Sequence, residues 1–141
     1  MVGRATLLLL ATLAVAACGG GESASVPAGL QDVVWEWQGS VYNNDSEATP
    51  DDPSRYTTQF ADDGTISIRA DCNQVNGRYE ESGGSLTITL GPSTKVACPE
   101  GSLSDAFLRD LEGAAIYFFD EGDLLVDIKY DTGTMRFSPV G

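Results

Sequence analysis

Two stretches decide the fold of this chain: Ala70-Asp71-Cys72-Asn73-Gln74-Val75-Asn76-Gly77-Arg78-Tyr79, and later Thr94-Lys95-Val96-Ala97-Cys98. Each holds one cysteine, and the third cysteine, Cys18, lies near the N-terminus. Both stretches follow an export signal, and the chain has no further cysteine pair and no histidine to complete a metal site. We therefore predict a disulfide between Cys72 and Cys98 that stabilises a small β-rich domain. A redox pair is the alternative, although the 25 intervening residues lack the Cys-x-x-Cys spacing that tunes a thiolate.

The N-terminal segment has the layout of a secretory signal. Arg4 precedes an apolar run from Ala5 to Ala17, which is shorter than the roughly 20 residues of a membrane-spanning helix. Its end, Leu-Ala-Val-Ala-Ala-Cys-Gly over residues 13–19, resembles the lipobox of bacterial lipoproteins. The resemblance implies that Cys18 is acylated and becomes the new N-terminus. The alternative is an ordinary cleaved signal that leaves Cys18 as a thiol.

This leader sets the predicted organisation of the chain. Residues 1–17 form the signal peptide, and Cys18 and the segment to residue 29, rich in Gly, Ser, Ala and Pro, form an acylated flexible tether. Residues 30–141 form one domain, because the length leaves room for a single core.

The composition excludes several classes of function. Lys and Arg number 8 against 21 Asp and Glu, so we expect no nucleic-acid partner, and attachment to a membrane only through the lipid on Cys18. The chain contains no histidine, which removes Ser-His-Asp and Cys-His catalysis and imidazole metal sites. We accordingly expect no metal, no cofactor and no enzymatic activity.

Alternating apolar residues predict an antiparallel β-structure. Asp62-Asp63-Gly64 and Ser82-Gly83-Gly84 have the composition of hairpin turns, and residues 43–54 that of a long exposed loop. The amide-rich run 73–77 interrupts the alternation. The predicted strands cover residues 33–37, 55–60, 65–72, 78–81, 85–90, 115–119, 124–130 and 134–137.

One helix is predicted, from Leu103 to Glu112, with Ser102 as its N-cap and a stripe of apolar residues at helical spacing. Eight short strands at hairpin spacing indicate an antiparallel sheet that curls into a small barrel or sandwich. The predicted class is therefore α+β and mostly β, with the one helix packed over an end or open edge of the sheet.

A polar cluster interrupts the sheet beside the first of the two stretches. Asn73, Gln74, Asn76 and Arg78 are candidate binding residues, because a curled sheet can present hydrogen-bonding groups at its mouth. The alternative is that Asn73 and Asn76 satisfy backbone amides of a turn.

The chain resembles the META domain family, which includes HslJ-like proteins. The resemblance covers residues 30–137 and departs from the family pattern at Asp71, where glycine is common, and at Val96, where methionine is common. It is carried by Leu30 with Trp35, Phe60 before Gly64, Cys72-Asn73 with Gly77 and Tyr79, Thr94 with Ala97-Cys98, and Phe107-Leu108 with Leu111. It implies a small, mostly β envelope domain, frequently lipid-anchored and associated in some members with stress, motility or antibiotic tolerance. It supplies no active-site residues.

These observations lead to one expected function and two alternatives. We expect a non-enzymatic lipoprotein, anchored on the extracytoplasmic side of a bacterial membrane, that binds a protein, peptide or small ligand or supports envelope integrity under stress. The first alternative is an inhibitor or chaperone-like partner of another exported protein, marked by an exposed patch with Tyr42, Tyr56 or Tyr117. The second is a hydrolase with two carboxylates, which requires an inward-facing pair of acids.

Overall fold

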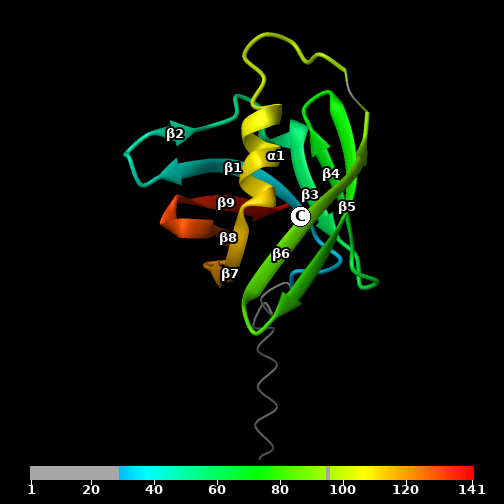
Figure 1. Ribbon diagram of the computed structural model, residues 1–141, viewed down its shortest axis with the longest axis vertical. Coiled ribbons are helices and arrows are strands. Elements are labelled where there is room, and N and C mark those ends of the chain that lie inside the picture. The colour runs from blue at the N-terminus through cyan, green and yellow to red at the C-terminus, as the bar shows by residue number, and fades with distance from the viewer. Residues whose placement is uncertain (1–28, 95) are drawn as a thin grey trace, which may run out of the picture.

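The computed structural model describes residues 29–94 and 96–141, which form a closed antiparallel barrel of eight strands with one α-helix (Figure 1). The prediction of a mostly β fold with one packed helix is confirmed. The strands are β1 (Val34–Tyr42), β3 (Tyr56–Phe60), β4 (Thr65–Ala70), β5 (Asn73–Ser82), β6 (Ser85–Ser93), β7 (Ala114–Asp120), β8 (Asp123–Ile128) and β9 (Gly133–Pro139), with a short β2 (Glu47–Ala48) beside β1 and the helix α1 (Ser104–Glu112) between β6 and β7.

The barrel closes because strands that follow one another in the chain also pair, and the last pairs with the first. β1 and β9 are joined through pairs such as Trp37 with Phe137. The pairing of β6 with β7 is much shorter, since it consists of the single pair Ser85 and Ile116. We call this junction the β6–β7 seam. Helix α1 lies over the region in which these two strands diverge (Figure 1).

The core consists of the inward-facing residues of the strands and the apolar face of α1. Trp35, Trp37 and Phe107 are completely buried. The ring of Phe107, from α1, stacks on Trp37 with centroids 4.9 Å apart and contacts Tyr56 edge-on at 5.7 Å. The helix therefore completes the core with an aromatic side chain that packs on rings of β1 and β3.

Five strands run further than the sequence pattern predicted, β7 and β9 by up to three residues, and β1, β5 and β6 through a bulge, the amide-rich run and a proline respectively. β1 continues beyond Trp37 through a bulge at Gly39, where a Cβ atom would lie 2.9 Å from the carbonyl oxygen of Ala48. β5 is continuous through residues 73–77, so the predicted interruption there is wrong. Its side chains alternate without a break, and the irregular pairing between Val75 and Gly77 places the extra residue in β6, between Leu90 and Ser93. β6 continues through Pro92, which is tolerated because β7 does not pair with that part of β6.

Other boundaries also differ from the prediction. The loop 43–54 contains β2 and the start of a short 3₁₀ helix, Pro53–Arg55. Leu103, and not Ser102, occupies the N-cap position of α1, although Ser102 Oγ still accepts a hydrogen bond from the Ser104 amide at 3.2 Å. β8 ends at Ile128, so Tyr130 lies outside the strand predicted over residues 124–130 and is exposed.

The two ends of the barrel differ in what they carry. The chain enters the described domain beside buried Leu30, where Gln31 bridges to Phe60, and the turns β3–β4, β5–β6 and β7–β8 lie at this same end. We call it the entry end. The opposite end carries the disulfide, the start of α1 and the β8–β9 turn, and we call it the disulfide end.

Candidate functional site

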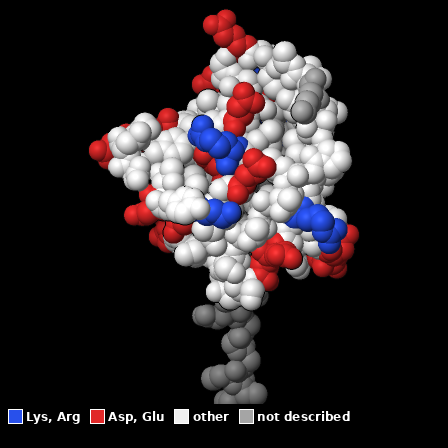
Figure 2. All heavy atoms as spheres, in the orientation of Figure 1, with Lys and Arg blue, Asp and Glu red and all other residues white. Residues whose placement is uncertain are grey.

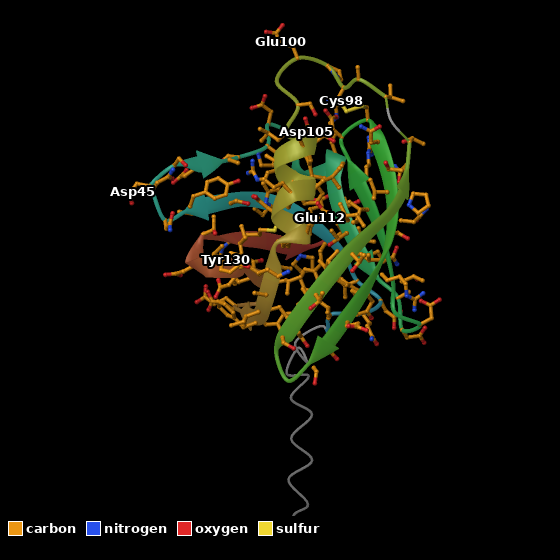
Figure 3. The ribbon with its side chains drawn as sticks, in the orientation of Figure 1. Asp45, Cys98, Glu100, Asp105, Glu112 and Tyr130 are labelled. Carbon is orange, nitrogen blue, oxygen red and sulfur yellow. A yellow bond between two sulfur atoms is a disulfide. The ribbon has the colours of Figure 1, made fainter. Side chains whose placement is uncertain are left out.

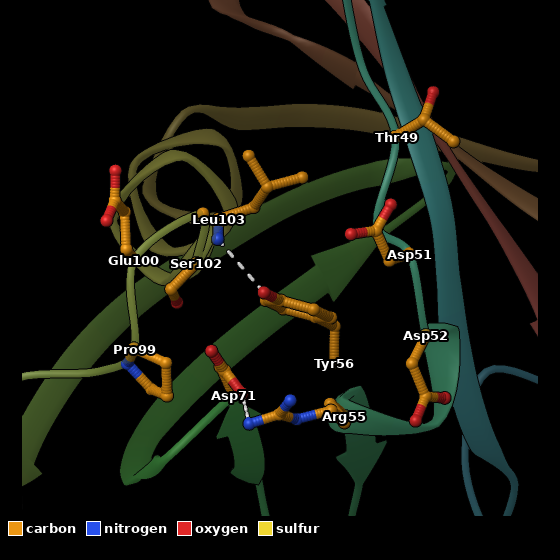
Figure 4. Close-up of a pocket in the computed structure, with 11 residues that line it drawn as sticks. Thr49, Asp51, Asp52, Arg55, Tyr56, Asp71, Pro99, Glu100, Ser102 and Leu103 are labelled. Atoms are coloured by element: carbon orange, nitrogen blue, oxygen red, sulfur yellow. Dashed lines mark hydrogen bonds and ion pairs between the residues drawn. The ribbon is translucent and has the colours of Figure 1, made fainter.

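Several hollows open at the disulfide end. One has a volume of about 200 Å³ and surrounds Asp71 (Figure 4), and we call it the Asp71 corner. Another has a volume of about 470 Å³ and lies beside Tyr130, and we call it the Tyr130 pocket. A third, of about 360 Å³, is lined by Asn73 of β5, the end of β6 and the first turns of α1. The Tyr130 pocket and this third hollow both fall in the size range of roughly 300–1,000 Å³ that is usual for ligand sites, and the Tyr130 pocket is the larger of the two.

The polar groups of the Asp71 corner are committed to holding the chain in place. Asp71 follows β4 with a φ of +60° and is 4% exposed. Its carboxylate forms an ion pair with the Arg55 guanidinium, without the alignment of a hydrogen bond, and its amide donates to the Arg55 carbonyl at 2.7 Å (Figure 4). Arg69 Nε also donates to the Asp71 carbonyl at 3.3 Å.

The same corner anchors the helix. The Tyr56 hydroxyl accepts a hydrogen bond from the Leu103 amide at 2.9 Å, just before the first residue of α1 (Figure 4). Cys72, next to Asp71, is bonded to Cys98 with their Cα atoms 5.5 Å apart, so the predicted disulfide is confirmed. The Asp71 corner thus joins β4, the 3₁₀ helix and the start of α1, and its chemistry is structural.

The Tyr130 pocket is built from three segments far apart in the sequence. The β1–β2 loop contributes Asn43, Asn44 and Ser46 after Tyr42 of β1. The last turn of α1 contributes Arg109 and Asp110, followed by Gly113, and the end of β8 with the turn after it contributes Ile128, Lys129, Tyr130 and Thr132. A Cβ atom at Gly113 would lie 2.7 Å from Ile128 Cγ2, so glycine is needed for this close packing.

A buried carboxylate organises one wall of the pocket. Asp110 is 2% exposed, and its Oδ2 accepts from the Tyr42 hydroxyl at 2.6 Å. Its Oδ1 accepts from Arg109 Nε and Nη2 at 3.2 and 3.0 Å. The Arg109 guanidinium also lies over the Tyr42 ring, 5.9 Å from its centroid.

The electrostatics of this wall keep Tyr42 and Arg109 each in one protonation state. Burial, and then the hydrogen bond to Asp110, raise the pKa of the Tyr42 phenol above its ordinary value of 10.0. The hydrogen bond to Asp110 likewise raises the pKa of Arg109. Tyr42 is therefore a neutral donor and Arg109 a cation throughout the physiological range.

Tyr130 is an exposed residue of the pocket with a strained backbone conformation. Its φ is +61° and that of Asp131 is +55°, the left-handed pair required by tight hairpin turns. Asparagine and glycine are preferred at such positions, and a bulky residue there is unusual. The Tyr130 side chain is 95% exposed, so burial offsets none of this cost. Figure 3 shows Tyr130 and Cys98 toward opposite ends of α1.

The sequence-predicted polar residues lie elsewhere, on and beside β5. Asn73 is occupied with the backbone of Val96, from whose amide its Oδ1 accepts at 2.9 Å and to whose carbonyl its Nδ2 donates at 3.2 Å. Gln74, Asn76 and Arg78 are exposed on the outer face of β5, because the residues between them face the core. The four do not converge on one cavity. Cys18 and its tether lie outside the described residues.

The sequence alone did not indicate the Tyr130 pocket. Alternation from Leu124 through Val126 and Ile128 to Tyr130 predicts a strand that includes Tyr130, although the run Lys129-Tyr130-Asp131-Thr132 before Gly133 ends that alternation with polar residues. Tyr42 and Asp110 are 68 positions apart. Within residues 29–94 and 96–141, no three acidic, cysteine or histidine side chains gather as a metal site would require, and no helix has the length and hydropathy to cross a membrane.

Comparison with known proteins places the chain in a family. The model of the META domain matches residues 28–139, so the chain belongs to the META domain family. It is similar to a protein from Burkholderia xenovorans solved by NMR, with 20% identity and a TM-score of 0.64, over 79% of this chain and 83% of that one. It is also similar to a DUF4847 family protein from Bacteroides vulgatus, with 14% identity and a TM-score of 0.53, over 74% and 90%. At these identities the likeness shows the fold alone. The search of curated proteins found no match.

Proposed function

We propose that this member of the META domain family is a non-enzymatic module of the bacterial cell envelope, of the HslJ-like type and anchored through an acylated Cys18. In this proposal it binds a small ligand, or the end of an exported peptide, in the Tyr130 pocket. The observation that carries the binding role is a strained, 95% exposed tyrosine beside the largest of the three hollows described at the disulfide end. Exposed aromatic residues and arginines are enriched among residues that dominate binding energy.

The chain entry and the Tyr130 pocket lie at opposite ends of the barrel, and this supports the anchored arrangement. The described chain begins at the entry end, and the Tyr130 pocket lies at the disulfide end. A tether that reaches Leu30 from a membrane would present the pocket away from that membrane. Acids in the turns of the entry end, including Asp62, Asp63, Asp120 and Glu121, would keep the domain off an anionic lipid surface.

The carboxyl groups give no support to a hydrolase. A general acid needs a raised pKa, whereas hydrogen bonds from Ser54 and Thr65 lower the pKa values of Asp52 and Asp63. The buried acids Asp71 and Asp110 are each held by an arginine. We therefore retain binding, and not catalysis, as the proposal.

An inhibitory or chaperone-like role is the second candidate, and a different surface favours it. Ile116 and Phe118 of β7 are 52% and 44% exposed, next to the β6–β7 seam. The tyrosines expected to mark such a surface are otherwise engaged. Tyr56 is buried, and Tyr117 donates to Glu81 Oε2 at 2.6 Å, which raises the pKa of Tyr117 to about 12.

Intact mass of the chain extracted from bacterial membranes tests the anchor. We expect a species that begins at an acylated Cys18 and has two thiols that alkylate only after reduction. The variant Cys18→Ser is the matched control and should yield no acylated species. A wild-type chain without lipid would contradict the anchored role.

Site-specific photocrosslinking in living cells tests the pocket. A photoreactive phenylalanine analogue at position 130 should give a discrete adduct that the same analogue at exposed Thr87, on the outer face of β6, does not give. Adducts of equal yield at both positions, or none at position 130, would remove the support for the Tyr130 pocket. An adduct formed only at position 118 would favour the inhibitory role.

A further inference from the structure

Most of the hydrogen-bond acceptors of the Tyr130 pocket are in use, whereas several of its donors are not. Both oxygens of Asp110 accept from Tyr42 and Arg109, and the Gly113 carbonyl accepts from the Lys129 amide at 2.7 Å. The Asn44 side-chain oxygen accepts from the Ser46 amide at 3.0 Å. A ligand that enters this pocket therefore meets few acceptors with spare capacity.

The remaining donors include two cationic groups. Within residues 29–94 and 96–141, no carboxylate lies within ion-pair distance of Lys129 Nζ, and Arg109 Nη1 makes no hydrogen bond. The side-chain nitrogen of Asn44 and the hydroxyl of Tyr130 are likewise without partners in this part of the chain. Because the free groups of Lys129 and Arg109 can only donate, a ligand that binds them must accept.

The local charge opposes that of the whole protein. The chain carries 21 acidic residues against 8 basic ones, yet the pocket wall combines Arg109 and Lys129 with a single carboxylate, that of Asp110. Figure 2 shows basic side chains gathered over α1 and just beyond its end, on a face with acidic residues around them. A cationic opening in an acidic surface attracts small anions and repels acidic proteins.

The rest of the wall is apolar. Ile128 packs closely against Gly113 at the base, the Tyr42 ring is partly buried, and the exposed ring of Tyr130 stands at the rim. These groups suit a flat or aliphatic body, which Tyr130 would cover on one side.

We propose that the Tyr130 pocket binds a small amphipathic carboxylate, with the anionic group at Lys129 and Arg109 and the apolar body between Tyr42 and Tyr130. This inference rests on the proposed binding function and names its ligand class. A free organic acid and the C-terminal carboxylate of a short peptide share this chemistry.

Three probes that share a phenyl group on a three-carbon chain, and differ only in the polar group at its end, separate the contribution of charge to binding from that of the apolar contact. Phenylpropionate, phenylpropanol and phenylpropylamine are titrated against the full-length chain in detergent, and binding is followed by saturation-transfer NMR. We expect the acid to bind about fivefold or more tightly than the alcohol, with the difference lost at high salt, and the amine to bind most weakly. A second set of titrations compares acetyl-Ala-Ala-Phe with its C-terminal amide. If the free peptide acid binds more tightly than phenylpropionate, the natural carboxylate is the C-terminus of a peptide.

Two variants and one matched control locate the site. Lys129→Gln should weaken binding of the acid about fivefold and leave binding of the alcohol unchanged, whereas Tyr130→Ala should weaken both. Arg78→Gln removes another exposed cation, on the outer face of β5, and should change neither. Circular dichroism confirms that each variant is folded.

Several results would overturn the inference. Equal binding of acid and alcohol would exclude the anionic specificity, and tighter binding of the amine would reverse it. Loss of binding in Arg78→Gln but not in Lys129→Gln would move the site to β5. If none of the probes binds while crosslinking at position 130 succeeds, the ligand class is wrong and the proposed function stands. If crosslinking also fails, both are wrong.

Discussion

Asp71 and Tyr130 share a left-handed backbone conformation, but they differ in burial and in the contacts of their side chains. Their φ angles are +60° and +61°, in the left-handed region that costs a residue with a side chain about 1–2 kcal/mol. Asp71 is 4% exposed, and an ion pair and backbone hydrogen bonds hold it. Tyr130 is 95% exposed, and its side chain has no such partner among the described residues. The comparison separates a strained residue that the fold requires from one that the fold tolerates.

The first way to test this comparison is to remove the disulfide beside Asp71. Cys72→Ala combined with Cys98→Ala should lower the free energy of unfolding by about 3.5 kcal/mol, because the crosslink closes a loop of about 27 residues in the unfolded chain. Equilibrium unfolding in urea measures the loss. A loss below about 1 kcal/mol would show that the other contacts of the Asp71 corner hold it unaided.

The second test removes the charge of Asp71 and keeps its conformation. Asp71→Asn should lower the free energy of unfolding by roughly 2 kcal/mol, a value reduced from that of a fully buried ion pair because Arg55 is 42% exposed. Asparagine tolerates a positive φ, so the change reports on the ion pair alone. The double variant with Arg55→Gln should be less than additive if the pair is the cause.

The third test makes one substitution at both positions. Tyr130→Gly should raise the free energy of unfolding by about 0.5–1 kcal/mol, because glycine relieves the strain and the exposed ring makes few contacts. Asp71→Gly relieves the same strain but loses the ion pair, so it should destabilise. Thermal unfolding of the two variants side by side gives the signs, and equal signs would refute the distinction.

The fourth and smallest effect concerns pH in the wall of the Tyr130 pocket. Because folding raises the pKa of Tyr42, its contribution to stability is fully present below pH 10, the ordinary pKa, and is lost as pH rises through the folded value. Phenolate absorbance should show two late-titrating tyrosines, Tyr42 and Tyr117. Tyr42→Phe should remove one of them, and Asp110→Asn should shift that same one to lower pH. Unchanged late titration in Asp110→Asn would exclude Asp110 as a cause.

The local parts of the fold could be predicted from the sequence. Alternation placed Ile66, Ile68, Leu86 and Ile88 inside, and the stripe through Phe107 and Leu111 identified α1. The cysteine count and the export signal were enough for the disulfide. These features depend on residues a few positions apart or on a single pairing.

The remaining features depend on distant contacts that local patterns do not contain. The continuation of β1 past Gly39 is supported by pairing with β9 at the far end of the domain. The Tyr130 pocket needs Tyr42, Asp110 and Tyr130 brought together by closure of the barrel. Asn73 was selected for its polarity, but its hydrogen bonds go to the backbone of Val96.

The β6–β7 seam bears on the order in which the chain connects the strands of the barrel. Trp35 pairs with Pro139, so the ends of the domain lie side by side, whereas the wall between β6 and β7 is held by a single pair. A circular permutant that joins the old termini by a short linker and opens the exposed loop between Glu100 and Gly101 keeps every strand pairing, and the Cys72–Cys98 bond still holds the new C-terminal segment. The architecture of this barrel thus does not depend on the order in which the chain connects its strands.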